Sequence, residues 1–339
     1  MASTTTATPS PSPPPSPKYE VPSPRLPIEI ILQIIQSIVP SPTSLLRVSD
    51  PRTKLLISFS RVAHFTYRPS SLLLRRHCAS IESPGALVRF SLAQVLSPAF
   101  HSDLSWCNIA SLYLAPFSES LPGFVVTVII PKLLSRLSQT LRVLVLDVHC
   151  VTHDGVGKNY AVVPRLRDAI SRLENLEEFI CLECPMVNDG HDPIMILIWR
   201  SLPKLKRVLF FNFAADTLWA MLTPSMVPRL EFVWLVDPRH GSENSISMIV
   251  KALRSELPRR VGTPPLKKRY TLAVSGCSQQ KYPAHGWARL SPEVDEFTKF
   301  RFIGGRSSAD TEEGIRRVAS HLERGTLWDL DAVEVAGGL

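Results

Sequence analysis

LPKLKRV (202–208) and VPRLEFV (227–233) share one pattern, with apolar residues at the first, fourth and seventh positions and proline at the second. The proline favours a turn, and the apolar alternation that follows favours a β-strand. The two copies begin 25 residues apart, a spacing typical of a repeated structural unit. The pattern therefore predicts a strand that recurs along the chain.

The same pattern continues through most of the chain as the frame L-x-x-L-x-L-x-x-N/C, with other apolar residues allowed at the first three marked positions. Frame starts fall at residues 109, 141, 176, 205, 230, 269 and 297. The second marked position is taken by Leu112, Leu144, Phe179, Val208, Val233, Leu272 and Phe300. The last marked position holds Cys only twice and never Asn, so we expect degenerate repeats of irregular curvature.

Segments with helical periodicity lie between these strands. They span residues 124–138, 162–173, 192–201, 244–257 and 309–324. Strand and helix thus alternate every 25 to 39 residues. This spacing predicts an α/β fold, an irregular βα solenoid over residues 77–339, because one such unit buries its apolar face only against a neighbour.

The N-terminal end has a different composition. Residues 1–24 contain 8 of the 30 prolines and little that could be buried, which predicts a disordered tail. Each of four serines precedes a proline, the minimal form of a proline-directed kinase site: Ser10, Ser12, Ser16 and Ser23. The tail can equally be a leader without any regulation.

Two short apolar segments follow the tail. LPIEIILQIIQSIVP (26–40) has Pro27 and Glu29 in its first turn and isoleucines at four-residue spacing, which predicts a helix. TKLLISFSRVAHFTY (53–67) predicts a second helix, ended by Pro69. The first segment is so short and so apolar that we expect it to need partners on more than one side.

LPIEI (26–30), followed by LLISFSRVAHFTYRPSSLLLRR (55–76), resembles the F-box of fungal F-box-like proteins. In that family L-P-x-E-I opens the first helix and V-(S)-x-x-F marks a later one. The resemblance covers residues 25–76, and the frames behind it resemble degenerate leucine-rich repeats. The chain departs from the family in its long connection (41–52) and at Ala63, where a small polar residue is common.

The resemblance implies a non-catalytic substrate receptor of a cullin-RING ubiquitin ligase. Its N-terminal helices would dock on a Skp-type adaptor and its repeats would hold a target protein. The implied adaptor-binding residues are Leu26, Pro27, Ile30, Ile34, Leu55, Leu56, Phe59, Val62 and Phe65. Periodicity does not separate those that face an adaptor from those packed inside. Alternatively, the helices only cap the first edge of the solenoid in an interaction scaffold.

Motifs of catalysis are not found. DGVGKN (154–159) completes neither a P-loop nor G-x-G-x-x-G, and neither H-E-x-x-H nor G-x-S-x-G occurs. We therefore expect no enzyme activity and no cofactor.

One pair of cysteines has the spacing of zinc ligands. Cys181 and Cys184 could bind a metal together with side chains from neighbouring units, namely His149, Cys150, His153 and His191. The pair also coincides with frame positions whose small apolar side chains pack inside. The frame favours core cysteines, so we expect no metal.

Positive charge is concentrated near the N-terminus. The net charge is +8, and residues 1–100 hold 10 of the 38 Lys and Arg but only 4 of the 30 Asp and Glu. The repeat region is nearly neutral, so we expect no nucleic-acid binding. The resemblance gives the imbalance a partner, because Skp-type adaptors are acidic and the F-box-like segment carries Arg61, Arg68, Arg75 and Arg76. A further basic cluster (259–269) predicts a solvated loop, a weak nuclear signal or a contact for a phosphorylated partner.

No secretory signal opens the sequence, and its longest apolar runs, GFVVTVII (123–130) and IMILIW (194–199), are too short to span a membrane. We therefore expect an intracellular protein, cytoplasmic or nuclear, without a membrane partner.

Overall fold

The computed structural model describes residues 26–39, 41, 43–100, 108–117, 128–148, 162–183, 198–211, 227, 229–236, 270–275, 298–303, 320–322 and 327–328. The helices are α1 (Ile28–Ser37), α2 (Pro51–Val62), α3 (His64–His77), α4 (Pro84–Phe100), α5 (Ile130–Leu137) and α6 (Val162–Ser171). The strands are β1 (Ala79–Ile81), β2 (Ser111–Phe117), β3 (Val143–Val148), β4 (Glu178–Glu183), β5 (Arg207–Phe211), β6 (Phe232–Val236), β7 (Tyr270–Ser275) and β8 (Thr298–Ile303). The expected tail, the helix at 244–257 and the basic cluster at 259–269 lie outside the described residues.

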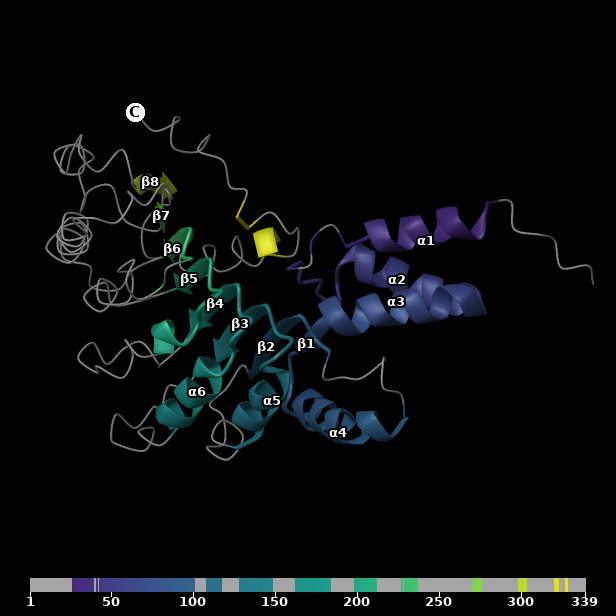
Figure 1. Cartoon of the computed structure of the whole chain (residues 1–339), viewed down its shortest axis with the longest axis horizontal. Coiled ribbons are helices and arrows are strands. Elements are labelled where there is room, and N and C mark those ends of the chain that lie inside the picture. Colours follow the sequence, from purple (N-terminus) through teal and green to yellow (C-terminus); the bar gives the residue numbers. More distant parts are fainter. Residues whose placement is uncertain are drawn as a thin grey trace, which may run out of the picture.

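The strands form one sheet in sequence order, each parallel to the next (Figure 1). Each frame found in the sequence coincides with a strand, and the register aligns their second marked positions. The aligned row consists of Leu112, Leu144, Phe179, Val208, Val233, Leu272 and Phe300. The structure therefore confirms the expected α/β class, as a parallel sheet combined with helices. The sheet begins one strand earlier than expected, because Ala79 of β1 pairs with Leu112.

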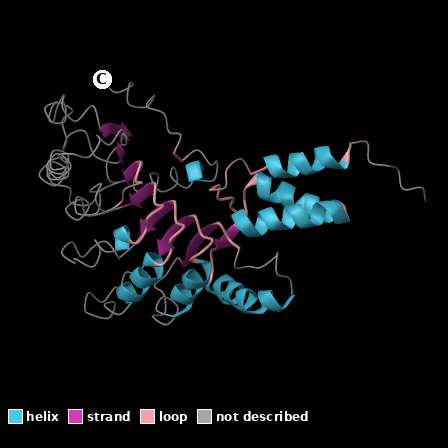
Figure 2. Ribbon diagram, viewed as in Figure 1, coloured by secondary structure: helices cyan, strands magenta, loops and turns pink. Residues whose placement is uncertain are grey.

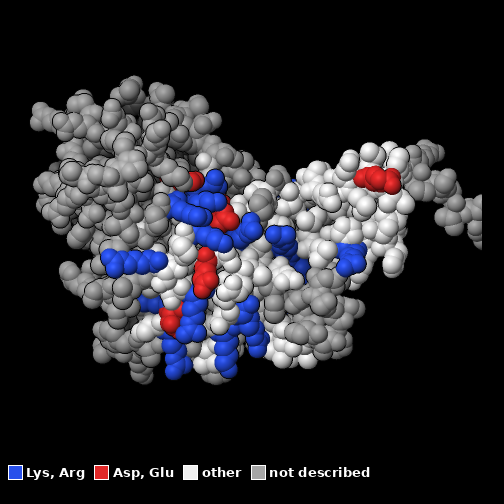
Figure 3. Space-filling view, in the orientation of Figure 1, with Lys and Arg blue, Asp and Glu red and all other residues white. Residues whose placement is uncertain are grey.

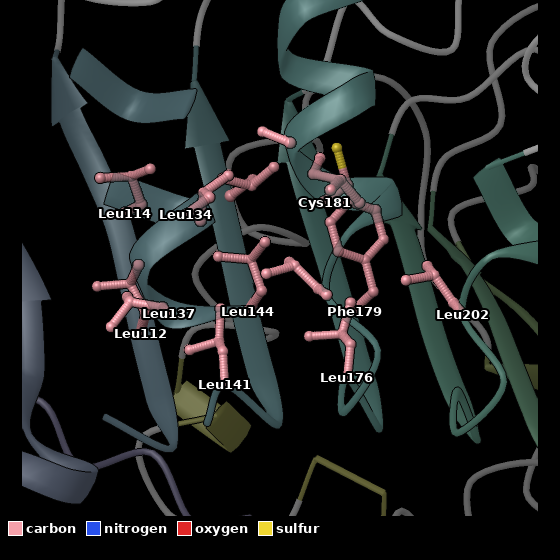
Figure 4. Close-up of a cluster of buried hydrophobic side chains, with 14 of the residues drawn as sticks. Leu112, Leu114, Leu134, Leu137, Leu141, Leu144, Leu176, Phe179, Cys181 and Leu202 are labelled. Atoms are coloured by element: carbon pink, nitrogen blue, oxygen red, sulfur yellow. The ribbon is translucent and has the colours of Figure 1, made fainter. Parts of the chain in front are cut away.

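Helices α4, α5 and α6 cover one face of the sheet (Figure 2). The frame residues of β2 to β5, together with Leu230 and Val233, point to this face and are buried with the apolar sides of the helices. In Figure 4, Leu134 and Leu137 of α5 lie among Leu112, Leu114 and Leu144 of the strands. α5 begins at Ile130 with Pro131 in its first turn, as expected for a residue whose missing N–H costs nothing there.

The opposite face of the sheet is also apolar. A row of alternate strand residues is buried there: Tyr113, Val145, Ile180, Leu209 and Trp234. The row packs against Leu45 from the N-terminal part and against Leu322 and Leu327 from the C-terminal part. The short segment at 320–322 lies over this face in Figure 1. Within the described residues, the protein itself therefore covers both faces of the sheet from β2 to β6.

The N-terminal helices form their own small core beside β1. Ile35 of α1 and Ile38, directly after it, pack with Leu46 and with Leu56 of α2. α3 then passes into β1 through Cys78 alone, and the backbone N–H of Ala110 donates to the Arg76 carbonyl at 2.9 Å. Hydrogen bonding of the sheet type therefore extends to the end of α3.

The expected second helix is wrong in its boundaries. The helix starting at Pro51 ends at Val62, and α3 starts at His64 after an extended Ala63 (φ −155°, ψ 158°). The Ala63 N–H donates to Thr66 Oγ1 at 3.2 Å, so Thr66 caps the new helix start. Pro69 lies inside α3 rather than ending it. Tertiary packing of α3 outweighs the local cost of the proline.

Candidate functional site

The nine residues expected to bind an adaptor divide by exposure. Those on the surface are Leu26, Pro27, Ile30, Ile34, Leu55 and Val62. Leu56 is fully buried in the N-terminal core, and Phe59 and Phe65 are half-buried. The structure thus separates a surface set from an internal set, a distinction that helical periodicity left open.

Helix α1 presents two apolar faces. Ile35 is fully buried, whereas Ile30 and Ile34, one helical turn apart, are 41% and 40% exposed. Leu26, which lies two residues before the helix begins, is 50% exposed. We name these three residues the α1 stripe. A helix that packs on one side normally shows polar residues on the other, so this stripe suits a partner rather than water.

Helix α2 adds a second exposed apolar pair. Leu55 is 44% and Val62 is 72% exposed, and their seven-residue separation puts them on one face of α2. Leu56 points the other way, into the core with Ile35 and Leu46. Phe59 packs against the same core. Leu56 and Phe59 therefore stabilise the packing of the N-terminal helices, independently of any function of Leu55 and Val62.

A further apolar stripe, which the sequence pattern had not singled out, lies on α4. Its exposed residues are Val88, Leu92, Val95 and Leu96. Leu87 of the same helix is fully buried against the sheet, so α4 is apolar on both sides. The four-residue spacing of Val88, Leu92 and Leu96 was the signal that could have revealed it.

A buried carboxylate lies at the start of β4, next to the face of the sheet that packs against Leu45, Leu322 and Leu327. Glu178 of β4 is 6% exposed, and burial raises its pKa from the ordinary value of 4.5. One of its oxygens accepts from Arg207 Nη1 at 3.1 Å and the other from Trp328 Nε1 at 2.7 Å. A hydrogen bond from the Thr43 side chain also favours the charged form. Glu178 therefore joins segments from both ends of the chain.

The indole of Trp328 is held by more than its hydrogen bond. Its ring meets the ring of Phe232 edge-on, with centroids 5.4 Å apart, and the Arg207 guanidinium lies 5.7 Å from its centroid. These contacts fix the C-terminal segment on β5 and β6. A target protein would not reach this part of the sheet without displacing Trp328.

A second buried polar group lies where the helices meet the sheet. His77, at the end of α3, is 2% exposed, and its Nδ1 is 3.0 Å from the Ser44 carbonyl. Burial, with a smaller contribution from the charges of Arg76 and Arg142, outweighs the hydrogen bond to Ser44 and lowers the pKa of His77 to about 4. His77 is therefore neutral at pH 7, with Nδ1 donating to Ser44. This hydrogen bond ties the α1–α2 connection to α3.

The possible zinc ligands do not come together in the described part of the chain. Cys181 is 2% exposed in the core between sheet and helices (Figure 4). Its proposed companions Cys184, His149, Cys150, His153 and His191 lie outside the described residues. Among the residues described, no cluster of His, Cys, Asp or Glu could hold a metal ion. Within the same residues, no helix has the length and apolar character to cross a membrane.

No protein-family model matches the chain, and neither does any curated protein.

Proposed function

We propose that the protein is a substrate-recognition subunit of a cullin-RING ubiquitin ligase. Its helices α1–α3 would act as an F-box-like module that binds a Skp-type adaptor. The observation that supports this proposal best is the α1 stripe, since Ile30 and Ile34 remain exposed on a helix that buries Ile35 on another side, and Leu26 is exposed just before this helix. The exposed Leu55 and Val62 of α2 extend the apolar surface of the same module.

The proposed role requires no chemistry from this chain. The sheet and its helices would form an irregular leucine-rich-repeat-type solenoid that holds a target protein. Tethering raises the effective concentration of the target near the ubiquitin-transferring enzyme. Such a receptor would work in the cytoplasm or the nucleus.

A second candidate function is a scaffold in which the helices cap the sheet. One observation favours it: α3 passes directly into β1, and the Leu46 N–H donates to the His77 carbonyl at 2.9 Å. A cap covers the first apolar edge of a stacked array, and no adaptor is then required.

A binding experiment with a purified Skp-type adaptor separates the two functions. The test variant is the double substitution Ile30→Asp and Ile34→Asp, which places two charges on the α1 stripe. The matched control is Val88→Asp on α4, where the replaced side chain is 55% exposed. The receptor function predicts that wild type and control bind equally and that the double variant binds at least about tenfold more weakly, a loss of about 1.4 kcal/mol.

Circular dichroism and thermal unfolding must show that all three proteins fold alike. Failure of the folded wild type to bind the adaptor, or equal binding by the double variant, would leave the capping function as the better description.

A further inference from the structure

A hollow with a mixed polar and apolar lining lies between the N-terminal helices and the turns that lead into β2, β3 and β4. Its volume is about 590 Å³, within the range of about 300–1,000 Å³ that is usual for ligand sites. Its polar lining includes Arg75, Arg76, Asn108, Gln139, Arg142 and Asn175. Figure 3 shows Lys and Arg side chains gathered over the strands and the adjoining end of α3.

The backbone places two of these arginines on either side of an alanine. The Ala110 N–H donates to the Arg76 carbonyl at 2.9 Å, and the Arg142 N–H donates to the Ala110 carbonyl at 2.7 Å. Chains paired in this way lie about 4.8 Å apart, so the two arginine backbones are separated by about 10 Å. Ala110 also lines the hollow, and its side chain is only a methyl group. A group with several oxygens can therefore be approached by a guanidinium from each side.

The hollow has an excess of positive charge. None of the described residues that line it is acidic. The nearby Glu177 divides its two carboxylate oxygens between two basic residues. Its Oε1 lies 3.6 Å from Arg142 Nη1, and its Oε2 lies 2.6 Å from Lys206 Nζ. Arg76 is exposed and has no ion-pair partner among the described residues. The lowered pKa of His77, to which Arg76 and Arg142 contribute, agrees with a positive potential at this point.

The remaining lining supplies hydrogen-bond donors and one apolar wall. The exposed side chains of Asn108 and Gln139 carry amide donors at the mouth of the hollow. Asn175 holds its position by donating to the Gln139 carbonyl at 2.7 Å and accepting from Lys204. Leu72 and Leu73 of α3 complete the wall on the opposite side.

We propose that this hollow binds a phosphate monoester. The arginine forks on its two sides match phosphate oxygens, and the amides of the turns can donate to the remaining ones. The leucine wall would contact the organic part of the ester. This proposal does not depend on adaptor binding or on a role of the protein in a ubiquitin ligase.

A phosphate dianion suits the hollow better than a single carboxylate does. A carboxylate has two oxygens and one negative charge, and a single arginine guanidinium can bind both oxygens and balance the charge. A phosphate monoester has three free oxygens and a charge near −2 at neutral pH, and so can engage Arg76 and Arg142 together. The phosphate can belong to a free small molecule or to a phosphorylated side chain of a peptide.

The test is calorimetric titration of the full chain with phenyl phosphate at low ionic strength and about pH 7.5, where the ester is a dianion. The wild type is expected to bind one equivalent. Arg76→Ala removes one fork and is expected to weaken binding about tenfold, the worth of one charge-assisted hydrogen bond. Gln139→Glu adds a carboxylate at the mouth and is expected to weaken binding by a similar factor. Both changed side chains are exposed, so folding is preserved.

Matched controls carry the same charge changes on the exposed side of α5. They are Arg136→Ala and Ser135→Glu, and both are expected to bind as the wild type does. Equal affinity in a test variant and its control would overturn the proposal. Failure of the wild type to saturate at one equivalent would overturn it as well.

Peptide titrations identify the source of the phosphate. A short phosphoserine peptide that binds more tightly than phenyl phosphate, while its unphosphorylated form does not bind, would assign the site to a modified protein segment. Tighter binding of phenyl phosphate than of the phosphopeptide would assign it to a small molecule. Either result supports the site if the Arg76→Ala variant no longer binds the preferred ligand.

Discussion

At the scale of single residues, the Ser44 carbonyl links three parts of the molecule. It lies 3.0 Å from His77 Nδ1 and accepts from the Ser111 hydroxyl, also at 3.0 Å. His77 is buried next to two arginines, so a proton on its ring is disfavoured both by the loss of hydration and by positive charge. The folded state therefore holds His77 neutral well below the usual pKa of histidine.

This arrangement predicts an acid-sensitive fold. The pKa of His77 falls from 6.5 in the unfolded chain to about 4 in the folded one. Its contribution is fully present above pH 6.5 and is lost as pH falls towards 4, because the unfolded chain takes up the proton first. The full loss is about 3 kcal/mol at 1.36 kcal/mol per pKa unit. His77→Asn retains a donor for Ser44 but cannot titrate, so its free energy of unfolding is expected to fall less over this range.

The measurement is urea unfolding of wild type and His77→Asn at several values of pH between about 7.5 and 4.5. Parallel pH dependences in the two proteins would show that His77 is not the group responsible.

Single residues were predicted well where they belong to a repeating pattern. Leu112, Leu144 and Phe179 were placed on strands and lie in one buried row. His77, Glu178 and Trp328 were not singled out. Each owes its role to a partner far along the chain, and such a partner leaves no periodic signal.

At the scale of elements, α1 offers a direct comparison of two adjacent isoleucines. Ile35 is fully buried with Ile38, Leu46 and Leu56, whereas Ile34 is 40% exposed. Ile35→Ala is expected to lower the free energy of unfolding by about 2–4 kcal/mol, through lost burial and the cavity left behind. Ile34→Ala is expected to change it by less than about 0.5 kcal/mol.

Chemical unfolding of both variants tests this orientation of α1. Equal losses in the two proteins would mean that the helix buries a different face, and the α1 stripe would then not be available to an adaptor.

Elements were predictable from local pattern only in part. The helix beginning near Pro27 follows from the preference of proline for the first turn of a helix, and Pro131 lies in the first turn of α5. The break at Ala63 and the inclusion of Pro69 in α3 do not follow from such preferences, because both depend on how α3 packs. Of the expected adaptor contacts, Leu56 lies in the core and Phe59 packs against it, because neighbouring helices, and not periodicity, decide which apolar face is buried.

At the scale of the whole molecule, Trp328 and Glu178 connect positions 150 residues apart. Trp328→Phe keeps the ring against Phe232 but removes the indole donor, leaving a buried carboxylate oxygen with one partner fewer. The expected loss in the free energy of unfolding is about 1–3 kcal/mol. The loss should be smaller in a Glu178→Gln background, where the acceptor carries no charge.

A double-mutant cycle of these two substitutions measures the interaction. A coupling energy of at least about 0.5 kcal/mol is expected for groups in direct contact. A coupling of zero would mean that the C-terminal segment is held by its apolar contacts alone.

The order of the strands in the sheet was predictable because each repeated unit pairs with the next one along the chain. The segments that cover the face opposite helices α4–α6 were not predictable. Leu45, Leu322 and Leu327 come from the two ends of the described chain and meet on one surface, so only the folded structure brings them together.

The long separation between the sheet and its cover has a consequence for synthesis. Trp234 is completed 94 residues before Trp328, and at about 5–20 residues per second this interval lasts roughly 5–20 s. During that time the apolar row from Tyr113 to Trp234 is without its C-terminal cover. The nascent chain is therefore expected to depend on chaperones until its last segment has left the ribosome.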